Sequence, residues 1–139
     1  MSADLYWMIT RNNNAYLLKK RDIKKPFSTE PGNLKNVASF RYNGLVQPKT
    51  VDVRAAKDGK GFVVTTKRAK QQNKPGKSNI SVTMSAGPRR SLYKLRRYLD
   101  GGKYRKDLTQ VALRKASAIL ESQKRSAIIA KKGRAKKSE

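Results

Sequence analysis

Apolar and polar side chains alternate in three runs through the middle of the chain, at residues 51–54, 62–67 and 80–84. Such alternation is typical of a β-strand with one buried face, because successive side chains in a strand point to opposite sides. The segment 58–61 (DGKG), between the first two runs, is rich in turn residues, which predicts a β-hairpin. The third run predicts a further strand.

The first 45 residues alternate between short predicted elements and turns. Ser2 can cap a short helix that ends near Arg11, and we expect this helix to dock by its apolar side. That side consists of Leu5, Met8 and Ile9, with Tyr6 and Trp7 beside them. Residues 15–18 predict a short strand that runs into a basic cluster. Residues 39–45 predict a strand that ends in an Asn-Gly turn.

Residues 89–99 (RRSLYKLRRYL) combine an apolar stripe with a basic one. At 100° per residue on a helix, the apolar stripe holds Leu92, Leu95 and Leu99. The opposite side holds Arg90, Lys94 and Arg97. We therefore predict that this helix packs on the core by its leucines and reaches phosphate groups with its cations. It should end at residues 100–102 (DGG).

The last predicted helix begins near Asp107 and Gln110, which resemble a capping box, and it carries a broad apolar stripe over residues 108–120. Residues 126–139 then become rich in Lys, Arg, Gly and Ala, which predicts a basic flexible tail. The order of elements predicts an α+β fold: a small antiparallel sheet with an N-terminal helix and two C-terminal helices. We expect one domain over residues 1–125, followed by the tail.

Charge points to the partner of this fold. The chain has 34 Lys and Arg residues against 9 Asp and Glu residues, so its formal net charge is +25. Internal carboxylates cannot neutralise this surplus, which indicates a polyanionic partner, first nucleic acid and next an anionic membrane surface. Basic residues exceed acidic ones throughout the chain, which favours folded RNA, with phosphates on several sides, over duplex DNA. The basic segment 67–78 is expected to be a long loop that is either functional or disordered.

Cations separated by aromatic residues are the candidate binding residues. Arg and Lys contact phosphates, and exposed aromatic rings can stack on unpaired bases. Tyr93 and Tyr104 could stack in this way, whereas Trp7, Phe40 and Tyr42 are expected in the core. The predicted RNA-binding residues are Arg11, Lys19, Lys20, Arg21, Arg41, Lys67, Arg68, Lys70, Lys74, Lys77, Arg89, Arg90, Lys94, Arg97, Lys103, Arg105, Lys131, Lys132 and Arg134.

The residue types that most often carry catalysis are missing. The chain has no His and no Cys, which removes the commonest general base, the commonest zinc ligands and the most nucleophilic side chain. Its carboxylates show no spacing that pairs them. Gly76-Lys77-Ser78 looks like the end of a phosphate-binding P-loop, but Gln71 stands where the first glycine should be. We expect no enzyme activity, no cofactor, no metal and no small-molecule substrate.

Hydropathy argues against a membrane protein. No apolar run approaches the ~20 residues that a membrane span needs. Residues 5–9 form too short an apolar stretch for a secretory signal, and Asp4 precedes them. We therefore expect a soluble intracellular protein without a membrane partner.

A set of short sequence words, in order through almost the whole chain, carries a family resemblance. The words are SADLYWM (2–8), RN (11–12), FSTEP (27–31), NL (33–34), SFRYNGL (39–45), DGKG (58–61), KYR (103–105), DL (107–108), ASAIL (116–120) and SQK (122–124). Together they resemble the eukaryotic large-subunit ribosomal protein family numbered twenty-eight, the L28e type. The resemblance implies a non-catalytic structural constituent of the cytoplasmic large ribosomal subunit, assembled in the nucleolus and bound to ribosomal RNA and to neighbouring large-subunit ribosomal proteins.

Two alternatives remain open at this stage. A ribosome-biogenesis factor can carry a related N-terminal domain, but such factors are much longer, whereas this chain stops at Glu139. A DNA-binding architectural protein would explain the charge but not the ordered sequence words.

Overall fold

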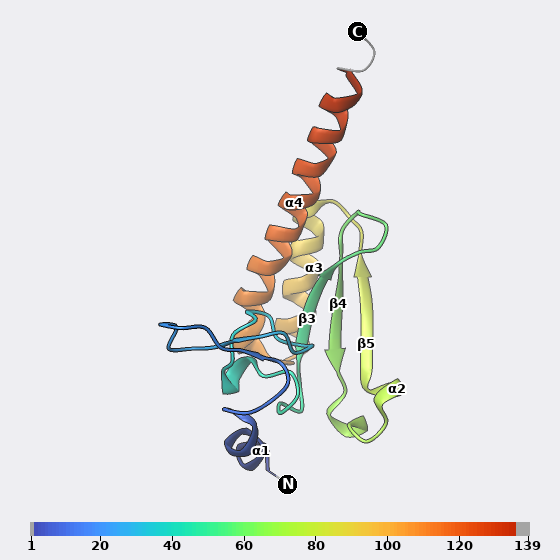
Figure 1. Cartoon of the computed structure of the whole chain (residues 1–139). Helices are drawn as coiled ribbons and strands as arrows, with labels where there is room; N and C mark the ends of the chain where they lie inside the picture. The colour runs from blue at the N-terminus through green and yellow to red at the C-terminus, as the bar shows by residue number, and fades with distance from the viewer. Residues whose placement is uncertain (1, 136–139) are drawn as a thin grey trace.

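The computed structural model describes the backbone of residues 2–135 and the side chains of residues 2–130. It has the predicted α+β architecture (Figure 1). The helices and strands in chain order are α1 (Ala3–Thr10), β1 (Leu17–Leu18), β2 (Phe27–Ser28), β3 (Val51–Ala55), β4 (Phe62–Lys67), α2 (Pro75–Ser78), β5 (Asn79–Met84), α3 (Pro88–Gly101) and α4 (Thr109–Ala135). Three single 3-10 turns accompany them, namely η1 (Phe40–Tyr42), η2 (Ala69–Gln71) and η3 (Lys106–Leu108).

The strands β3, β4 and β5 form an antiparallel sheet in that order, which confirms the three alternating runs as strands. The register pairs Val53 with Val64 and Val64 with Val82, so the apolar side chains of all three strands line up on one face. Val51, Val53, Phe62 and Val64 are completely buried on that face. A second sheet consists only of the pair β1 and β2.

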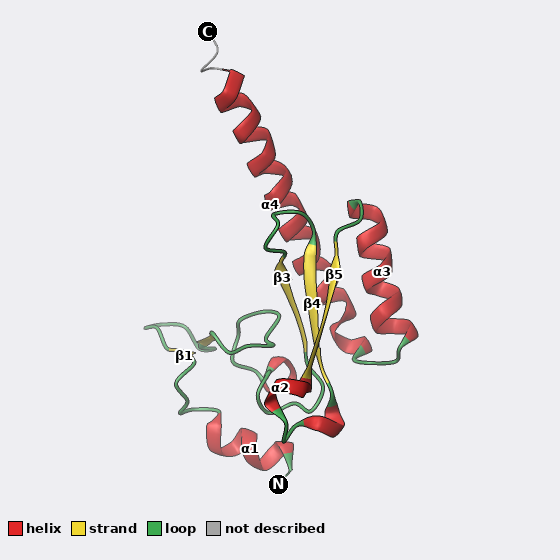
Figure 2. Ribbon diagram, turned by 90° about the vertical axis from the view of Figure 1, so that its right-hand side faces the viewer, coloured by secondary structure: helices red, strands yellow, loops and turns green. Residues whose placement is uncertain are grey.

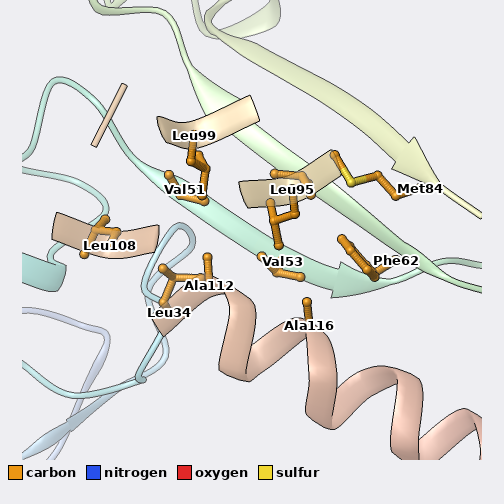
Figure 3. Close-up of a cluster of buried hydrophobic side chains, with 11 residues drawn as sticks. Leu34, Val51, Val53, Phe62, Met84, Leu95, Leu99, Leu108, Ala112 and Ala116 are labelled. Atoms are coloured by element: carbon orange, nitrogen blue, oxygen red, sulfur yellow. The ribbon is translucent and has the colours of Figure 1, made fainter. Parts of the chain in front are cut away.

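The helices α3 and α4 cover the apolar face of the sheet (Figure 2) and complete the core (Figure 3). Leu95 and Leu99 of α3 are completely buried, while Leu92 is partly buried at the edge of the core. Ala112 and Ala116 of α4 are also buried, and their small side chains let the helix lie close to the sheet. The predicted core sides of both helices are therefore confirmed.

The β3–β4 turn is tied to α4 by a pair of hydrogen bonds from one amide side chain. Gln123 Oε1 accepts a hydrogen bond from the Gly61 N–H (2.9 Å), and Gln123 Nε2 donates one to the Gly61 carbonyl oxygen (2.8 Å). Gly61 has a φ of +81°, and a Cβ at this position would lie 2.2 Å from the carbonyl oxygen of Met84. Glycine is required here, and the Gln123 clamp sets the level at which α4 crosses the sheet.

A buried polar cluster around Glu30 organises the segment before β3. Glu30 Oε1 accepts hydrogen bonds from Asn33 Nδ2 (2.9 Å) and from the Gly44 N–H (3.2 Å). The backbone is so close at Gly44 that a Cβ would lie 1.9 Å from a carbonyl oxygen of the facing segment. Segments 27–34 and 39–45, both part of the family resemblance, are thereby held together.

Residues 39–45 do not form the predicted strand. Phe40–Tyr42 instead make the single turn η1, which places the Phe40 ring 6.0 Å from the Trp7 ring. The Asn-Gly signal does mark a turn, in which Asn43 Oδ1 accepts hydrogen bonds from the N–H groups of Leu45 and Val46. An alternation of three residues is too short to distinguish a strand from a turn, and the N–H groups here bond locally.

The helix α1 forms where predicted, with the Ser2 hydroxyl accepting a hydrogen bond from the Leu5 N–H at 3.3 Å. The expected docking side is wrong, because Met8 and Ile9 are each 65% exposed and Leu5 is about half exposed. The helix instead contacts η1 through Trp7, which lies on the opposite side of the helix and not beside these three residues as expected. A single large aromatic side chain can bury about 150 to 250 Å², so a count of apolar positions selects the wrong side.

The helix α4 differs from the prediction at both ends. Asp107 lies in η3, and its carboxylate binds Arg105 instead of capping the helix, which begins at Thr109. The helix runs through Ala135, so residues 126–135 of the expected tail are helical, and the rest of that tail lies outside the described residues. Extending an existing helix costs less than starting one, and Ala, Lys and Arg are strong helix formers. This part of α4 projects beyond the sheet and α3 (Figure 1).

Candidate nucleic-acid interface

The exposed cations lie on several sides of the molecule. Most of the predicted binding side chains in the described part of the chain are exposed, and these are Arg11, Lys19, Lys20, Arg21, Arg41, Arg68, Lys70, Lys74, Lys77, Arg89, Arg90, Lys94, Arg97 and Lys103. Figure 2 shows the segment around β1 and the helix α3 on opposite sides of the three-stranded sheet, with α2 near the lower end of the sheet. The structure thus spreads the cations around the fold and does not gather them on one face.

The helix α3 presents its predicted basic side to solvent. Arg90, Lys94 and Arg97 are exposed, opposite the buried leucines. Tyr93 lies among them and is 64% exposed, so its ring is accessible for stacking. The division of the helix into a core side and a cationic side is confirmed, while contact of the cations with RNA stays a prediction.

Arg105 has a structural role within the chain. Its guanidinium makes two hydrogen bonds to the Asp107 carboxylate (2.8 and 2.9 Å) and donates to the backbone carbonyl oxygens of Lys49 and Arg41. Four of the five N–H donors of the guanidinium are therefore occupied. The hydrogen bonds from Arg105 lower the pKa of Asp107, and Arg41 at 3.7 Å contributes to this shift. Arg105 therefore has little donor capacity left for a phosphate.

A second internal ion-pair network surrounds the buried side chain of Asp52. Lys115 Nζ lies 3.1 Å from Asp52 Oδ1, and Arg54 Nε lies 2.7 Å from Asp52 Oδ2. Burial raises the pKa of Asp52, but the two cations outweigh burial, so the pKa lies below its ordinary value of 3.8. Lys115 thereby ties α4 to β3. No local pattern indicated this pair, whose members are 63 residues apart in the chain.

Tyr104 fixes the ends of two strands and is not a free stacking platform. Its hydroxyl accepts a hydrogen bond from the Lys67 N–H (3.0 Å) and lies 3.2 Å from the Thr50 carbonyl oxygen. Burial raises the pKa of this hydroxyl, so it stays protonated and can donate to a carbonyl. The Lys49 ammonium lies 5.6 Å from the centroid of the ring. The backbone of Lys67 is consequently held in place at the end of β4.

The predicted basic loop at residues 67–78 is folded into η2 and α2. The Arg68 N–H donates to the Ser78 carbonyl oxygen at 2.7 Å and so closes the loop at its base. Gly76-Lys77-Ser78 lies within α2, which has four residues and leads directly into β5. This order is the reverse of the strand, loop and long helix of a P-loop.

Two adjoining pockets lie beside Lys67. The first, of about 460 Å³, is lined by the side of the sheet that faces away from α3 and α4. The second, of about 570 Å³, lies between α1 and the segment 67–73. Leu45, Lys67 and Gln72 line both pockets, which we call the Lys67 pockets.

The helix α4 also carries basic residues. Lys131, Lys132 and Arg134 lie on α4, but their side chains are outside the described residues. Arg114, Lys124 and Arg125 were not among the predicted binding residues yet are exposed, which becomes evident only once the core side of α4 is known.

The described side chains contain no cluster suited to hold a metal ion. Of the helices within residues 2–135, none is long and apolar enough to cross a membrane.

Comparison with known proteins gives a consistent result. The sequence profile of the Ribosomal L28e protein family matches residues 5–122. The chain is 40% identical over 131 residues to the large ribosomal subunit protein eL28 of Caenorhabditis elegans, in an alignment that covers 94% of this chain and 98% of the relative. The protein of the same name from Schizosaccharomyces pombe is 32% identical over 126 residues, covering 89% of this chain and 94% of the relative. That of Dictyostelium discoideum is 42% identical over 85 residues, 61% of either chain.

Proposed function

Since this chain belongs to the Ribosomal L28e protein family, we propose that it is a structural constituent of the large subunit of the cytoplasmic ribosome. In this role it binds and stabilises folded ribosomal RNA, beside neighbouring large-subunit ribosomal proteins. It joins the subunit during assembly in the nucleolus. It has no catalytic function and needs neither a cofactor nor a small-molecule substrate.

The placement of exposed cations on several sides is the observation that carries this proposal. A protein that lies on duplex DNA by one face concentrates its cations on that face, whereas folded RNA presents phosphates around an embedded protein. The chain itself cannot neutralise these cations, because its 34 Lys and Arg residues face only 9 Asp and Glu residues. The phosphate groups of RNA supply the missing negative charges.

Sedimentation of the tagged full-length protein from a cell lysate, with sequencing of crosslinked RNA, tests the proposal directly. We expect the protein in large subunits and in translating ribosomes at physiological salt, crosslinked to large-subunit ribosomal RNA. Residence only in nucleolar pre-ribosomes would favour a biogenesis factor. Recovery with chromatin and DNA would favour an architectural protein, and either result would overturn the proposal.

A further inference from the structure

The Lys67 pockets have the size and the chemistry of a site for a small polar ligand. Their volumes of about 460 and 570 Å³ fall within the roughly 300 to 1,000 Å³ of small-molecule sites. They adjoin at Lys67, so one ligand could extend from the first pocket into the second. The walls come from segments distant in sequence, namely α1 with Asn14, residues 31–32, residues 43–54 and residues 65–79.

Lys67 supplies a positioned positive charge at this junction. Its backbone is bonded to the Tyr104 hydroxyl and to the Thr50 carbonyl oxygen, so the side chain starts from a fixed point. The acidic residue in the described lining, Asp52, is already shared by Lys115 and Arg54. Among the described residues, Lys67 forms no ion pair. A phosphate group is the ligand that such a lysine recognises.

Apart from Lys67, the described lining of the second pocket is uncharged and combines polar with apolar side chains. Among its described lining residues, Lys67 is the one charged side chain. The side-chain amides of Gln72 and Asn73 make no hydrogen bond to any other group in the described part of the protein, so their donors and acceptors remain available. Tyr6, at 45% exposure, adds an aromatic ring to the same wall.

We propose that the Lys67 pockets bind one unpaired nucleotide of the RNA partner. The phosphate binds Lys67, the base stacks on Tyr6, and the amides of Gln72 and Asn73 bond to the edge of the base. Stacking and edge recognition of splayed bases are the usual basis of recognition in single-stranded RNA, whereas a base-paired duplex does not fit a pocket of this size. This inference rests on the proposed function and specifies one contact within it.

Photo-crosslinking of the full-length protein to short single-stranded RNA containing thiouridine tests the site. We expect the crosslinked base on the peptides that carry Tyr6 or Gln72 and Asn73, and little crosslinking there with duplex RNA of the same length. Lys67→Gln should weaken binding of the short single strand about tenfold, the loss expected for a hydrogen bond to a charged group. Tyr6→Ala should weaken it by a similar factor, because stacking of one base is lost.

Matched variants separate the pocket from general charge and surface effects. Lys57→Gln removes the same charge from an exposed position in the β3–β4 turn, and Tyr16→Ala removes an exposed tyrosine outside the pockets. Thermal unfolding of each variant checks that the fold is kept. Equal losses for Lys67→Gln and Lys57→Gln, or crosslinks distributed over the whole surface, would overturn the proposal.

Two further measurements identify the source of the nucleotide and keep the two proposals distinct. Free adenosine or uridine monophosphate should compete only weakly. Tight binding of the monophosphate would replace RNA by a free nucleotide as the ligand and overturn the inference.

If Lys67→Gln affects neither binding nor crosslinking while the wild-type protein still sediments with large subunits, the pocket inference fails and the ribosomal function stands. If the wild-type protein does not sediment with them, the proposed function itself fails.

Discussion

Gly59 and Gly61 share a left-handed backbone but differ in their surroundings. Their φ angles are +69° and +81°, yet a Cβ at Gly59 would meet nothing within 4 Å, whereas one at Gly61 would lie 2.2 Å from a carbonyl oxygen. Gly59→Ala should therefore cost only the backbone strain, about 1 to 2 kcal/mol. Gly61→Ala should cost this strain and a further ~1 to 3 kcal/mol from overpacking. Urea unfolding of the two variants measures the difference, and equal costs would show that the turn can move away from β5.

Asp52 predicts an acid-sensitive contribution to stability. Its pKa is lower in the folded protein than in the unfolded chain, so the stabilisation is present above a pH of about 4 and is lost as the pH falls through the folded pKa. Asp52→Asn should lower stability at neutral pH, because Lys115 and Arg54 lose their partner. It should also reduce the further loss of stability between neutral and acid pH.

The control for this prediction is Asp58→Asn, a change of the same kind in the exposed β3–β4 turn. The free energy of unfolding is measured for each protein across the acid range. A variant at Asp52 whose stability declines with acid as steeply as that of the Asp58 variant would show that the network does not contribute.

The helix α3 separates structural from binding side chains. Leu95 is completely buried, so Leu95→Ala should destabilise the protein by about 2 to 5 kcal/mol. Leu92→Ala should cost less, because Leu92 lies at the edge of the core and part of its side chain already contacts water. Thermal unfolding of the two variants checks the order, and the reverse order would mean that the helix is rotated about its axis.

The basic side of α3 should affect RNA binding and not the stability of the fold. Changing Arg90, Lys94 and Arg97 together to Gln should leave the fold nearly intact, or stabilise the free protein slightly by relieving repulsion. The loss should appear in RNA binding, measured as affinity over a range of salt concentrations. A triple variant that unfolds early and keeps the wild-type salt dependence would contradict the assigned roles.

The elements that could be predicted are those with a repeating local pattern. The runs 51–54, 62–67 and 80–84, and the stripes of α3 and α4, repeat long enough to fix both element type and buried side. The docking side of α1, the turn η1 and the Gln123 clamp depend on contacts between distant segments. Such contacts leave no periodic signal, and Gln123 was noticeable only as part of a family word.

The surplus positive charge of the protein determines how it binds RNA. A charge of +25, distributed over exposed side chains on several sides, should make the isolated protein bind many RNAs. Counterion release gives a slope of log affinity against log salt of roughly −0.7 to −0.9 for each phosphate neutralised. A footprint of several phosphates therefore predicts a steep line, which filter binding can measure. A flat line would remove the argument for a polyanionic partner.

Charge alone does not predict which of the basic residues are available for binding. Exposure agrees with the prediction for the cations of α3, which face away from the core. Arg105 could not be distinguished from them, because its carbonyl partners on Arg41 and Lys49 are distant in sequence and come close only in the folded chain. A count of cations gives the sign and size of the net charge, while the fold decides which cations remain available to bind RNA.

The projecting part of α4 has a fixed rotational orientation relative to the sheet and α3. Beyond Gln123, the described helix continues without interruption to Ala135, a length of roughly 18 Å at 1.5 Å per residue. Inserting one residue directly after Gln123 would rotate everything beyond it by about 100°, whereas inserting seven would restore nearly the original azimuth about 10 Å farther out. The position of a surface that contacts the outer part of α4 therefore depends on the rotation of the helix as well as on its length. Both are fixed relative to the body by the Gln123 clamp.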